Sequence, residues 1–223
     1  MAENSAREVD RRAAGECDDM VAQIRPPKLP VQERARHTVE KILQAAVDIL
    51  IEEGVVGLNT NKVADRAGVN IATLYTYFPD KISIIAYLAQ RFEDLRVESV
   101  EKCAVELGHA DYRQWFGDAI DRMADFRLNE PGGLAIRRAL LATSELRHLD
   151  LVSTERAAAA LVDGIMAQCP GLSETRAKMI SRIYTVAVTA ILDDAFCGTP
   201  HDIEEIEELK RMATAYFDDC FGG

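Results

Sequence analysis

Apolar positions recur at helical spacing through most of this chain. From Arg34 onward, apolar side chains return every three or four residues, which is the repeat of one face of an α-helix. The first such stripe is formed by Val39, Ile42, Leu43, Ala46, Ile49 and Leu50. No later segment shows the strict alternation of a half-buried strand, so the pattern predicts an all-α protein.

Glycine, proline and capping residues divide this pattern into about nine helices. Gly54 is suited to end the first helix, and Asn59 and Asn70 are suited to cap two short ones. Asp202, followed by Glu205, is typical of the start of the last helix. The predicted helices run from residue 34 to Gly54 and over 60–67, 71–78, 81–107, 112–129, 134–146, 150–168, 173–196 and 203–221.

The first 32 residues do not continue the helical pattern. They are polar and charged, and Pro26-Pro27 near their end disfavours a helix. We therefore divide the chain into a flexible arm, a small helical domain and a larger helical domain, at residues 1–32, 33–80 and 81–223.

The small domain contains a helix-turn-helix pattern. Ala64 is small enough for a close helix crossing, and Gly68 tolerates the left-handed conformation that the turn requires. Val63, Val69 and Leu74 would form the core that joins the two helices. The second helix of such a motif can lie in the major groove of DNA.

The residues that follow are far more specific. Residues 73–81, with the sequence TLYTYFPDK, resemble the TLY-x-(H/Y)-F-x-x-K signature of the TetR family of transcription regulators. The resemblance extends over about residues 34–91, roughly a quarter of the chain. It implies an N-terminal DNA-binding domain followed by a helical domain that dimerises and binds a small-molecule effector.

The resemblance also implies which residues contact DNA. Ala72 would let the helix approach the base edges and touch a thymine methyl group. Lys81 opens the next helix, where its charge and the helix N-terminus both favour a phosphate. We predict DNA contacts by Thr60, Asn61, Asn70, Ala72, Thr73, Tyr75, Thr76, Tyr77 and Lys81.

Several of these residues could have a structural role instead. Tyr75 could be a packing residue, and Asn70 only a helix cap, whereas Leu74 and Phe78 are expected in the core. Ile71 departs from the family pattern, because many relatives carry Lys or Arg there. That departure shifts phosphate binding toward Lys81, Arg36 and Lys62.

The distribution of charge is compatible with DNA binding despite a net charge of -11. Residues 34–81 hold six basic and six acidic side chains, whereas residues 82–223 hold 15 basic and 24 acidic ones. Only positive groups near the phosphates contribute to binding. In the arm, Arg25 and Lys28 could reach a minor groove, although a solvated tail explains them more simply.

The last two predicted helices carry long apolar stripes. The resemblance implies that they form a four-helix bundle between two chains; the alternative is that they serve only the intrachain core. The predicted interface residues are Ile180, Tyr184, Ala187, Val188, Ile191, Ile206, Leu209, Ala213 and Phe217.

An effector pocket is expected among the middle helices. One of these helices is rich in aromatic and sulfur-containing side chains, although such a stripe is more often core than ligand site. A buried Arg137 could bind the carboxylate of an acidic ligand, but a solvated face is the commoner explanation. The candidate pocket residues are Tyr112, Trp115, Phe116, Met123, Phe126 and Arg137.

Other classes of function find little support. The chain lacks a Gly-rich phosphate loop, GxSxG, HExxH and metal-ligand spacing, so we expect no catalytic residues, no metal and no cofactor. Its five cysteines form no CxxC pair, which favours inert thiols over a redox sensor. With no apolar run of about 20 residues and no signal peptide, we expect a cytoplasmic protein without a membrane partner.

These expectations combine into one functional hypothesis. We expect a TetR-type regulator, more readily a repressor than an activator, that binds a palindromic operator as a homodimer and is released by a small-molecule effector. The alternative is a helical adaptor with the same fold that acts through protein partners.

Overall fold

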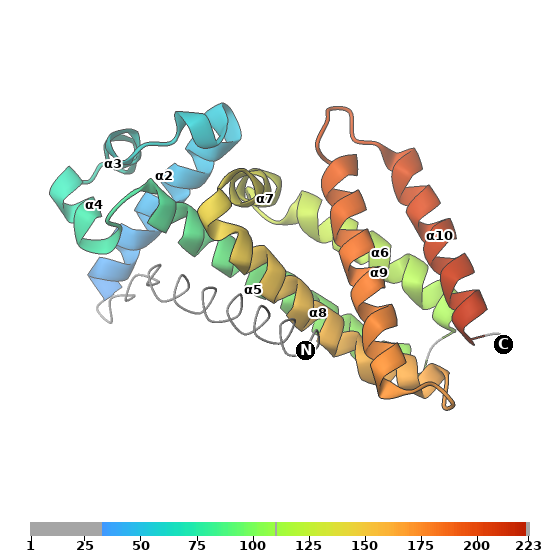
Figure 1. The fold of residues 1–223 in the computed structure, drawn as a ribbon. Coiled ribbons are helices and arrows are strands. Elements are labelled where there is room, and N and C mark those ends of the chain that lie inside the picture. Colours follow the sequence, from blue (N-terminus) through green and yellow to red (C-terminus); the bar gives the residue numbers. More distant parts are fainter. Residues whose placement is uncertain (1–32, 110, 222–223) are drawn as a thin grey trace, which may run out of the picture. The chain divides into compact units, whose positions relative to one another are not determined.

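The computed structural model describes residues 33–109 and 111–221, and these residues form nine α-helices and one short 3-10 helix, without a strand (Figure 1). This confirms the predicted all-α class. Arg25, Lys28 and Cys17 lie outside the described residues. The elements are α2 (Glu33–Gly57), α3 (Thr60–Ala67), α4 (Ile71–Tyr77), α5 (Lys81–Leu107), α6 (Tyr112–Asn129), α7 (Gly133–Ala142), η1 (Ser144–Leu146), α8 (Arg147–Gln168), α9 (Glu174–Ala195) and α10 (Ile203–Phe221).

Short polar side chains cap several helices, three of them at the positions that the sequence predicted and one at Asp111. Each accepts a hydrogen bond from a backbone N–H of the first turn, at 2.8–3.0 Å, which satisfies a donor that the helix leaves unpaired. The residues are Asn59, Asn70, Asp111 and Asp202.

Three predicted helices have clearly different bounds in the structure. Gly54 has φ 67° and interrupts the helical conformation, but helical residues resume after it and α2 ends at Gly57. The helix expected over 134–146 divides into α7 and η1, because Thr143 adopts an extended conformation with φ -111° and ψ 98°. The following helix accordingly begins earlier than predicted, at Arg147.

The chain forms two compact units. The first ends at Gln90 and also takes in Ala135–Leu149, and the second comprises Arg91–Leu134 and the chain from Asp150 onward. The backbone passes between the units within α5, within α7 and within α8. Each connection is therefore a helix and not a loop.

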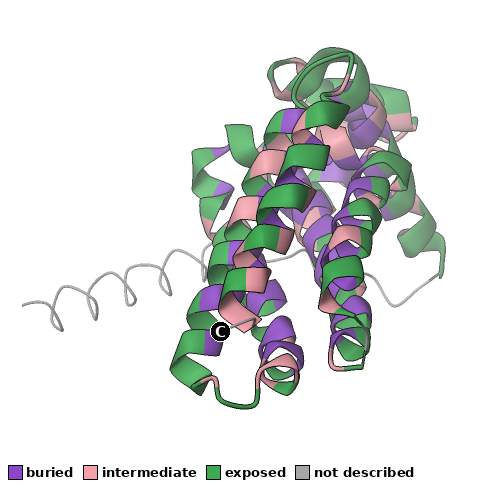
Figure 2. Ribbon diagram, turned by 90° about the vertical axis from the view of Figure 1, so that its right-hand side faces the viewer, coloured by how far each residue is buried: buried purple, intermediate pink, exposed green. Residues whose placement is uncertain are grey.

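Aromatic side chains fill the core of the second unit. α10 packs against α6 and α9, and α9 and α10 run side by side in opposite directions (Figure 1). Phe116 of α6 stacks on Phe217 of α10 at a ring distance of 3.5 Å, and Tyr184 of α9 meets both rings edge to face. Buried and exposed positions lie on different sides of the helices, as Figure 2 shows.

Among the described residues, no helix is both long and apolar enough to cross a membrane.

Candidate functional site

The turn between α3 and α4 is built around Gly68. Its φ of 65° and ψ of 35° lie in the left-handed region, where glycine is favoured. The N–H of Gly68 donates to the carbonyl oxygen of Asp65 at 3.2 Å, and the N–H of Val69 donates to that of Ala64 at 3.0 Å. These bonds end α3 and allow α4 to start at Ile71, as a helix-turn-helix requires.

The predicted DNA-contacting residues lie apart from the core of this motif. Val63, Leu74 and Phe78 are fully buried and join α3 and α4 to their neighbours, whereas Val69 is only partly buried. All nine predicted contacts remain accessible: Asn61, Asn70, Ala72, Tyr75, Thr76 and Lys81 are exposed, and Thr60, Thr73 and Tyr77 are partly buried. The polar face of α4 is thus available to a partner.

Hydroxyl groups link the two short helices on this accessible face. The Tyr75 hydroxyl lies 3.1 Å from the Thr60 hydroxyl, so one of the two donates to the other. Thr76 donates to the carbonyl oxygen of Ala72 at 3.0 Å. The Tyr75–Thr60 pair has two hydroxyl protons and needs only one for its mutual bond, so the other can serve a phosphate oxygen.

Two ion pairs tie the end of α2 to α3. Lys62 lies 2.6 Å from Glu53, and Arg66 lies 2.7 Å from Glu52. The hydrogen bond that Arg66 donates to the carboxylate of Glu52 raises the pKa of Arg66. Because Lys62 is already paired with Glu53, a DNA phosphate must compete for its charge. Arg36 and Lys81 are exposed on α2 and α5.

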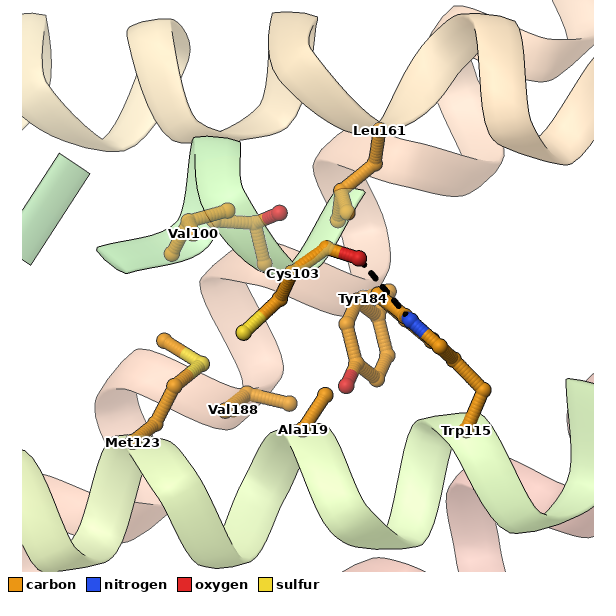
Figure 3. A pocket seen from close by; sticks show the side chains of 9 residues that line it. Val100, Cys103, Trp115, Ala119, Met123, Leu161, Tyr184 and Val188 are labelled. Atoms are coloured by element: carbon orange, nitrogen blue, oxygen red, sulfur yellow. Dashed lines mark hydrogen bonds between the residues drawn. The ribbon is translucent and has the colours of Figure 1, made fainter. Parts of the chain in front are cut away.

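The second unit contains a small cavity between α5, α6, α8 and α9 (Figure 3). The cavity has a volume of about 10 Å³, which is close to the minimum for a single water molecule. Its lining residues are Val100, Cys103, Trp115, Ala119, Met123, Leu161, Tyr184, Thr185 and Val188.

Two residues with buried hydroxyl groups, Tyr184 and Thr185, belong to the otherwise apolar lining. Neither Tyr184 Oη nor Thr185 Oγ1 has a hydrogen-bond partner among the described residues, although both atoms are buried. Figure 3 shows the Tyr184 hydroxyl and the Cys103 sulfur facing the same space. Burial raises the pKa of both groups, so each stays neutral at ordinary pH.

Trp115 closes one side of the cavity. Its indole N–H donates to the backbone carbonyl oxygen of Cys103 at 3.0 Å, which joins α6 to α5. The ring is buried and packs edge to face against Phe116. Since this is the only tryptophan in the chain, its environment reports directly on the cavity.

Two of the six predicted pocket residues, Trp115 and Met123, line this cavity. Phe116 instead lies in the stack on Phe217. Arg137 is 3% exposed, so it is not part of a solvated face, and it belongs to α7 in the first unit.

The other two predicted pocket residues make contacts away from the cavity. Tyr112 donates its hydroxyl to Asp218 at 2.9 Å, and Phe126 packs on the ring of Phe92 at 5.2 Å. The aromatic spacing along α6 correctly identified an apolar stripe, but only part of that stripe lines the cavity.

Seven lining residues were not among the predicted pocket residues. Tyr184 and Val188 had been assigned to a dimer interface, and five others had no assignment: Val100, Cys103, Ala119, Leu161 and Thr185. One signal was visible in the sequence, because the hydroxyl residues Ser181, Thr185 and Thr189 recur at steps of four among the buried residues of α9. The aliphatic lining residues Val100, Ala119 and Leu161 show no sequence feature that distinguishes them from other core residues.

Buried charges in the second unit are paired with one another. Arg96 lies 2.7 Å from Glu93, and both contact the hydroxyl of Ser153 on α8. Arg127 contacts Asp193 at 3.4 Å. No charged side chain is among the described residues that line the cavity.

Most of the predicted dimer residues lie inside this chain's own core. Seven of the nine are at most 5% exposed, and only Ala187 and Ile191 are partly accessible. A helical stripe shows that a face is apolar without showing whether its partner belongs to the same chain. The seven buried residues are Ile180, Tyr184, Val188, Ile206, Leu209, Ala213 and Phe217.

A different apolar stripe on α9 is accessible. Met179, Ile183 and Val186 are 49%, 48% and 42% exposed and follow one another at steps of four and three residues. Met212 on α10 is also 48% exposed. A second chain that packs on α9 and α10 would meet these residues.

The described residues contain no group of three or more His, Cys, Asp or Glu side chains that could hold a metal ion. No disulfide bond joins the described cysteines, which are Cys103, Cys169, Cys197 and Cys220.

Comparisons with known proteins agree with this architecture. Residues 42–88 match the family model described as bacterial regulatory proteins of the tetR family, and residues 111–217 match that of the tetracyclin repressor-like C-terminal domain. The chain is 26% identical over 183 residues to the HTH-type transcriptional activator FasR of Mycolicibacterium smegmatis, a match that covers 81% of this chain and 78% of FasR.

Solved structures show the same fold. A putative TetR-family regulator from Mesorhizobium loti superposes with a TM-score of 0.64 at 19% identity, covering 84% of this chain and 96% of that one. A TetR-family regulator from Streptomyces coelicolor gives a TM-score of 0.58 at 23% identity, covering 82% and 98%. Because the two family models match the helix-turn-helix and the helical domain in turn, this chain belongs to the TetR family of transcription regulators.

Proposed function

We propose that two copies of this chain bind one operator through their α4 helices, and that a small molecule in the second unit controls the binding. The observation that carries this proposal is that α4 has one buried side and one exposed side. Its apolar residue Leu74 is buried, whereas Ala72, Tyr75 and Thr76 are exposed together on the face that a groove would meet.

The proposed contacts fall into two groups. Ala72, Thr73 and Tyr77 on α4 read base edges and adjacent backbone in the major groove. Lys81 at the start of α5 and the Tyr75–Thr60 hydroxyl pair hold phosphates on either side, which fixes the register of α4 on the DNA.

A homodimer supplies the second half-site. One helix of seven residues offers few base contacts, so a unique site needs two copies about one helical turn of DNA apart, or a multiple of that distance. The exposed stripe of Met179, Ile183 and Val186 supports a dimer surface on α9, with Met212 on α10 beside it.

Control by a ligand follows from the chain's connectivity. The backbone joins the two units inside α5, α7 and α8, so a change in how the second unit packs is transmitted through helices. A ligand that binds one packing better than the other shifts the population away from the DNA-binding form. A coupling of about 1–3 kcal/mol would weaken operator binding roughly 5- to 150-fold.

Repression is the proposed outcome of binding. A dimer that occupies a promoter blocks polymerase without any further contact, whereas activation also needs a surface that recruits polymerase. FasR, whose name records an activator, shows that a relative can act in the opposite sense. The site of action would be the cytoplasm, where the chromosome lies.

Operator selection tests the proposal. Genomic fragments are incubated with the purified full chain at two salt concentrations, and the enriched sequences are cloned upstream of a reporter. We expect an inverted repeat whose binding is weakened by Lys81→Ala and by Tyr77→Phe, and a reporter signal that falls when the protein is expressed.

Lys178→Ala is the matched control, because Lys178 is an exposed lysine on α9 that pairs with Glu174. It removes one positive charge outside the helix-turn-helix and should leave the selected sequence and its affinity unchanged. A folded dimer that enriches no sequence at low salt would overturn the DNA proposal in favour of an adaptor that acts through proteins. A reporter signal that rises would overturn repression alone.

A further inference from the structure

α9 buries three hydroxyl groups that the described part of the chain does not satisfy. Tyr184, Thr185 and Thr189 are 5%, 3% and 5% exposed, and their hydroxyl oxygens have no hydrogen-bond partner among the described residues. A buried polar group without a partner costs free energy, so native proteins rarely retain one without a reason.

Other hydroxyls in this chain show the usual arrangement. Thr143 donates to the carbonyl oxygen of Ala139 at 2.7 Å, and Thr214 donates to that of Lys210 at 3.0 Å. This backbone bond to the residue four positions earlier is the ordinary solution for a threonine in a helix. Thr185 makes no such bond, although its helix offers the same carbonyl oxygens.

Two of the three residues with an unsatisfied hydroxyl belong to the cavity lining. Tyr184 and Thr185 belong to its lining, whereas Thr189 lies one turn further along α9. The other lining residues are aliphatic, aromatic or sulfur-containing. An occupant that accepts or shares a hydrogen bond at this place would satisfy these groups and cover the apolar wall.

The charge of the surroundings restricts the occupant further. All nine described lining residues are uncharged, and burial raises the pKa of the Cys103 thiol, which keeps it protonated. The buried cations of the same unit, Arg96 and Arg127, each face a carboxylate. An ionised ligand group in the cavity would therefore lose its water without gaining a countercharge.

We propose, building on the regulator function above, that this cavity binds an uncharged and mainly apolar molecule whose carbonyl or hydroxyl oxygen bonds with Tyr184 Oη and Thr185 Oγ1. The ligand's apolar body contacts Val100, Leu161 and Met123. The two hydroxyls then determine its orientation, because the indole N–H of Trp115 is already bonded to the carbonyl oxygen of Cys103.

Binding requires the cavity to widen. Its present volume suits about one water molecule, so a larger ligand must displace side chains. Met123 is unbranched and can change its conformation at low cost. Trp115 is held to α5 by its bond to the Cys103 carbonyl oxygen, so widening changes the surroundings of the indole.

The test uses Trp115 fluorescence of the full-length protein. Three nine-carbon probes of similar shape are titrated below their solubility limits at pH 7: 2-nonanone, n-nonane and nonanoate. We expect 2-nonanone to bind at least tenfold more tightly than either of the others. Tyr184→Phe should reduce the affinity for 2-nonanone at least fivefold and leave that for n-nonane unchanged.

Tyr216→Phe is the matched control. Tyr216 lies on α10, bonds with Cys220 and is not among the lining residues, so its loss of a hydroxyl should leave 2-nonanone affinity unchanged. The melting temperature of Tyr184→Phe should equal or exceed that of the wild type, because the variant removes a buried hydroxyl that has no partner.

Several results would overturn the proposal. They are a lack of saturable response to 2-nonanone, nonanoate binding as tightly as 2-nonanone, and an unchanged 2-nonanone affinity in Tyr184→Phe. A clear fall in the melting temperature of Tyr184→Phe would show that the Tyr184 hydroxyl already has a hydrogen-bond partner. That result would also overturn the proposal. Operator binding, measured on the same samples without a probe, tests the regulator function separately.

Discussion

The hydroxyl groups of Tyr75 and Thr60 lie 3.1 Å apart and connect the middle of α4 to the first residue of α3. Tyr75 is half exposed, so its ring is not a core element. The contact therefore does two things. It braces the two short helices against each other, and it places a shared hydroxyl donor at the rim of the face that we propose for DNA.

Tyr75→Phe removes one member of this hydroxyl pair. A single exposed hydrogen bond contributes about 0.5–1.5 kcal/mol, so we expect operator affinity to fall roughly 2- to 12-fold while the protein stays folded. Fluorescence anisotropy with the selected operator measures the change. Thr60→Val should give a similar loss, and the double variant should lose less than the sum of the two free energies, because both substitutions break the same bond. Fully additive losses would show that the hydroxyls act independently.

Glu53→Gln should have the opposite effect on DNA binding. Glu53 holds Lys62 at 2.6 Å on the surface, and neutralising the carboxylate frees the ammonium group for a phosphate. Affinity for any DNA sequence should rise, and the slope of log affinity against log salt should steepen by about 0.9, the value for one additional phosphate contact. Stability should change little, since exposed ion pairs contribute about 0–1 kcal/mol.

Glu174→Gln is the matched control for that experiment. Glu174 pairs with Lys178 on α9 in the same way, and both side chains are exposed, but the pair lies outside the helix-turn-helix. The variant removes the same charge and should leave the salt dependence unchanged. If both variants raise affinity equally, net charge is responsible and the local role of Lys62 is excluded.

Ile183→Glu tests the dimer surface on α9. Ile183 is 48% exposed at the centre of the stripe between Met179 and Val186, so the substitution should not disturb the core of a single chain. Buried charge at the centre of an interface is costly, and we expect the dimer dissociation constant to rise by at least about tenfold. Sedimentation velocity measures it, and operator binding should weaken in parallel.

Val56→Glu serves as the control for Ile183→Glu. Val56 is 91% exposed and lies at the end of α2 in the first unit. The Val56→Glu variant introduces the same side chain at an exposed apolar position outside α9 and α10, and we expect its dimer to persist. Dissociation of the Val56 variant, or a stable dimer of the Ile183 variant, would place the interface elsewhere.

Helix boundaries could be predicted well because capping is a local property. Asn59, Asn70 and Asp202 each bond to a backbone N–H within three residues of themselves, so the sequence around them contains the whole interaction. Thr143 is a different case. It breaks the helix expected over 134–146 although no glycine or proline marks the position, and it donates its hydroxyl back to Ala139.

The partners of the apolar stripes could not be predicted in the same way. Tyr184 and Val188 fit a helical stripe, but only the packing of α9 against α5, α6 and α8 shows that they border a cavity. The accessible stripe around Ile183 also has helical spacing, so the sequence alone does not distinguish it from the buried one. The predicted DNA contacts stay a prediction, but their accessibility follows from the sequence, because the TLYTYFPDK segment assigns each position to the buried or accessible side of one short helix.

Gly68→Ala and Gly117→Ala should change stability in opposite directions, although a new methyl group would meet no atom within 4 Å at either site. Gly68 has φ 65°, which an L-residue adopts at a cost of roughly 1–2 kcal/mol, so Gly68→Ala should destabilise the protein by about that amount. It should also weaken operator binding, because this turn orients α4. Gly117 lies inside α6, where alanine is favoured by about 0.5–1 kcal/mol, so Gly117→Ala should stabilise. Urea unfolding measures both, and equal effects of one sign would show that the left-handed turn is not the source of the difference.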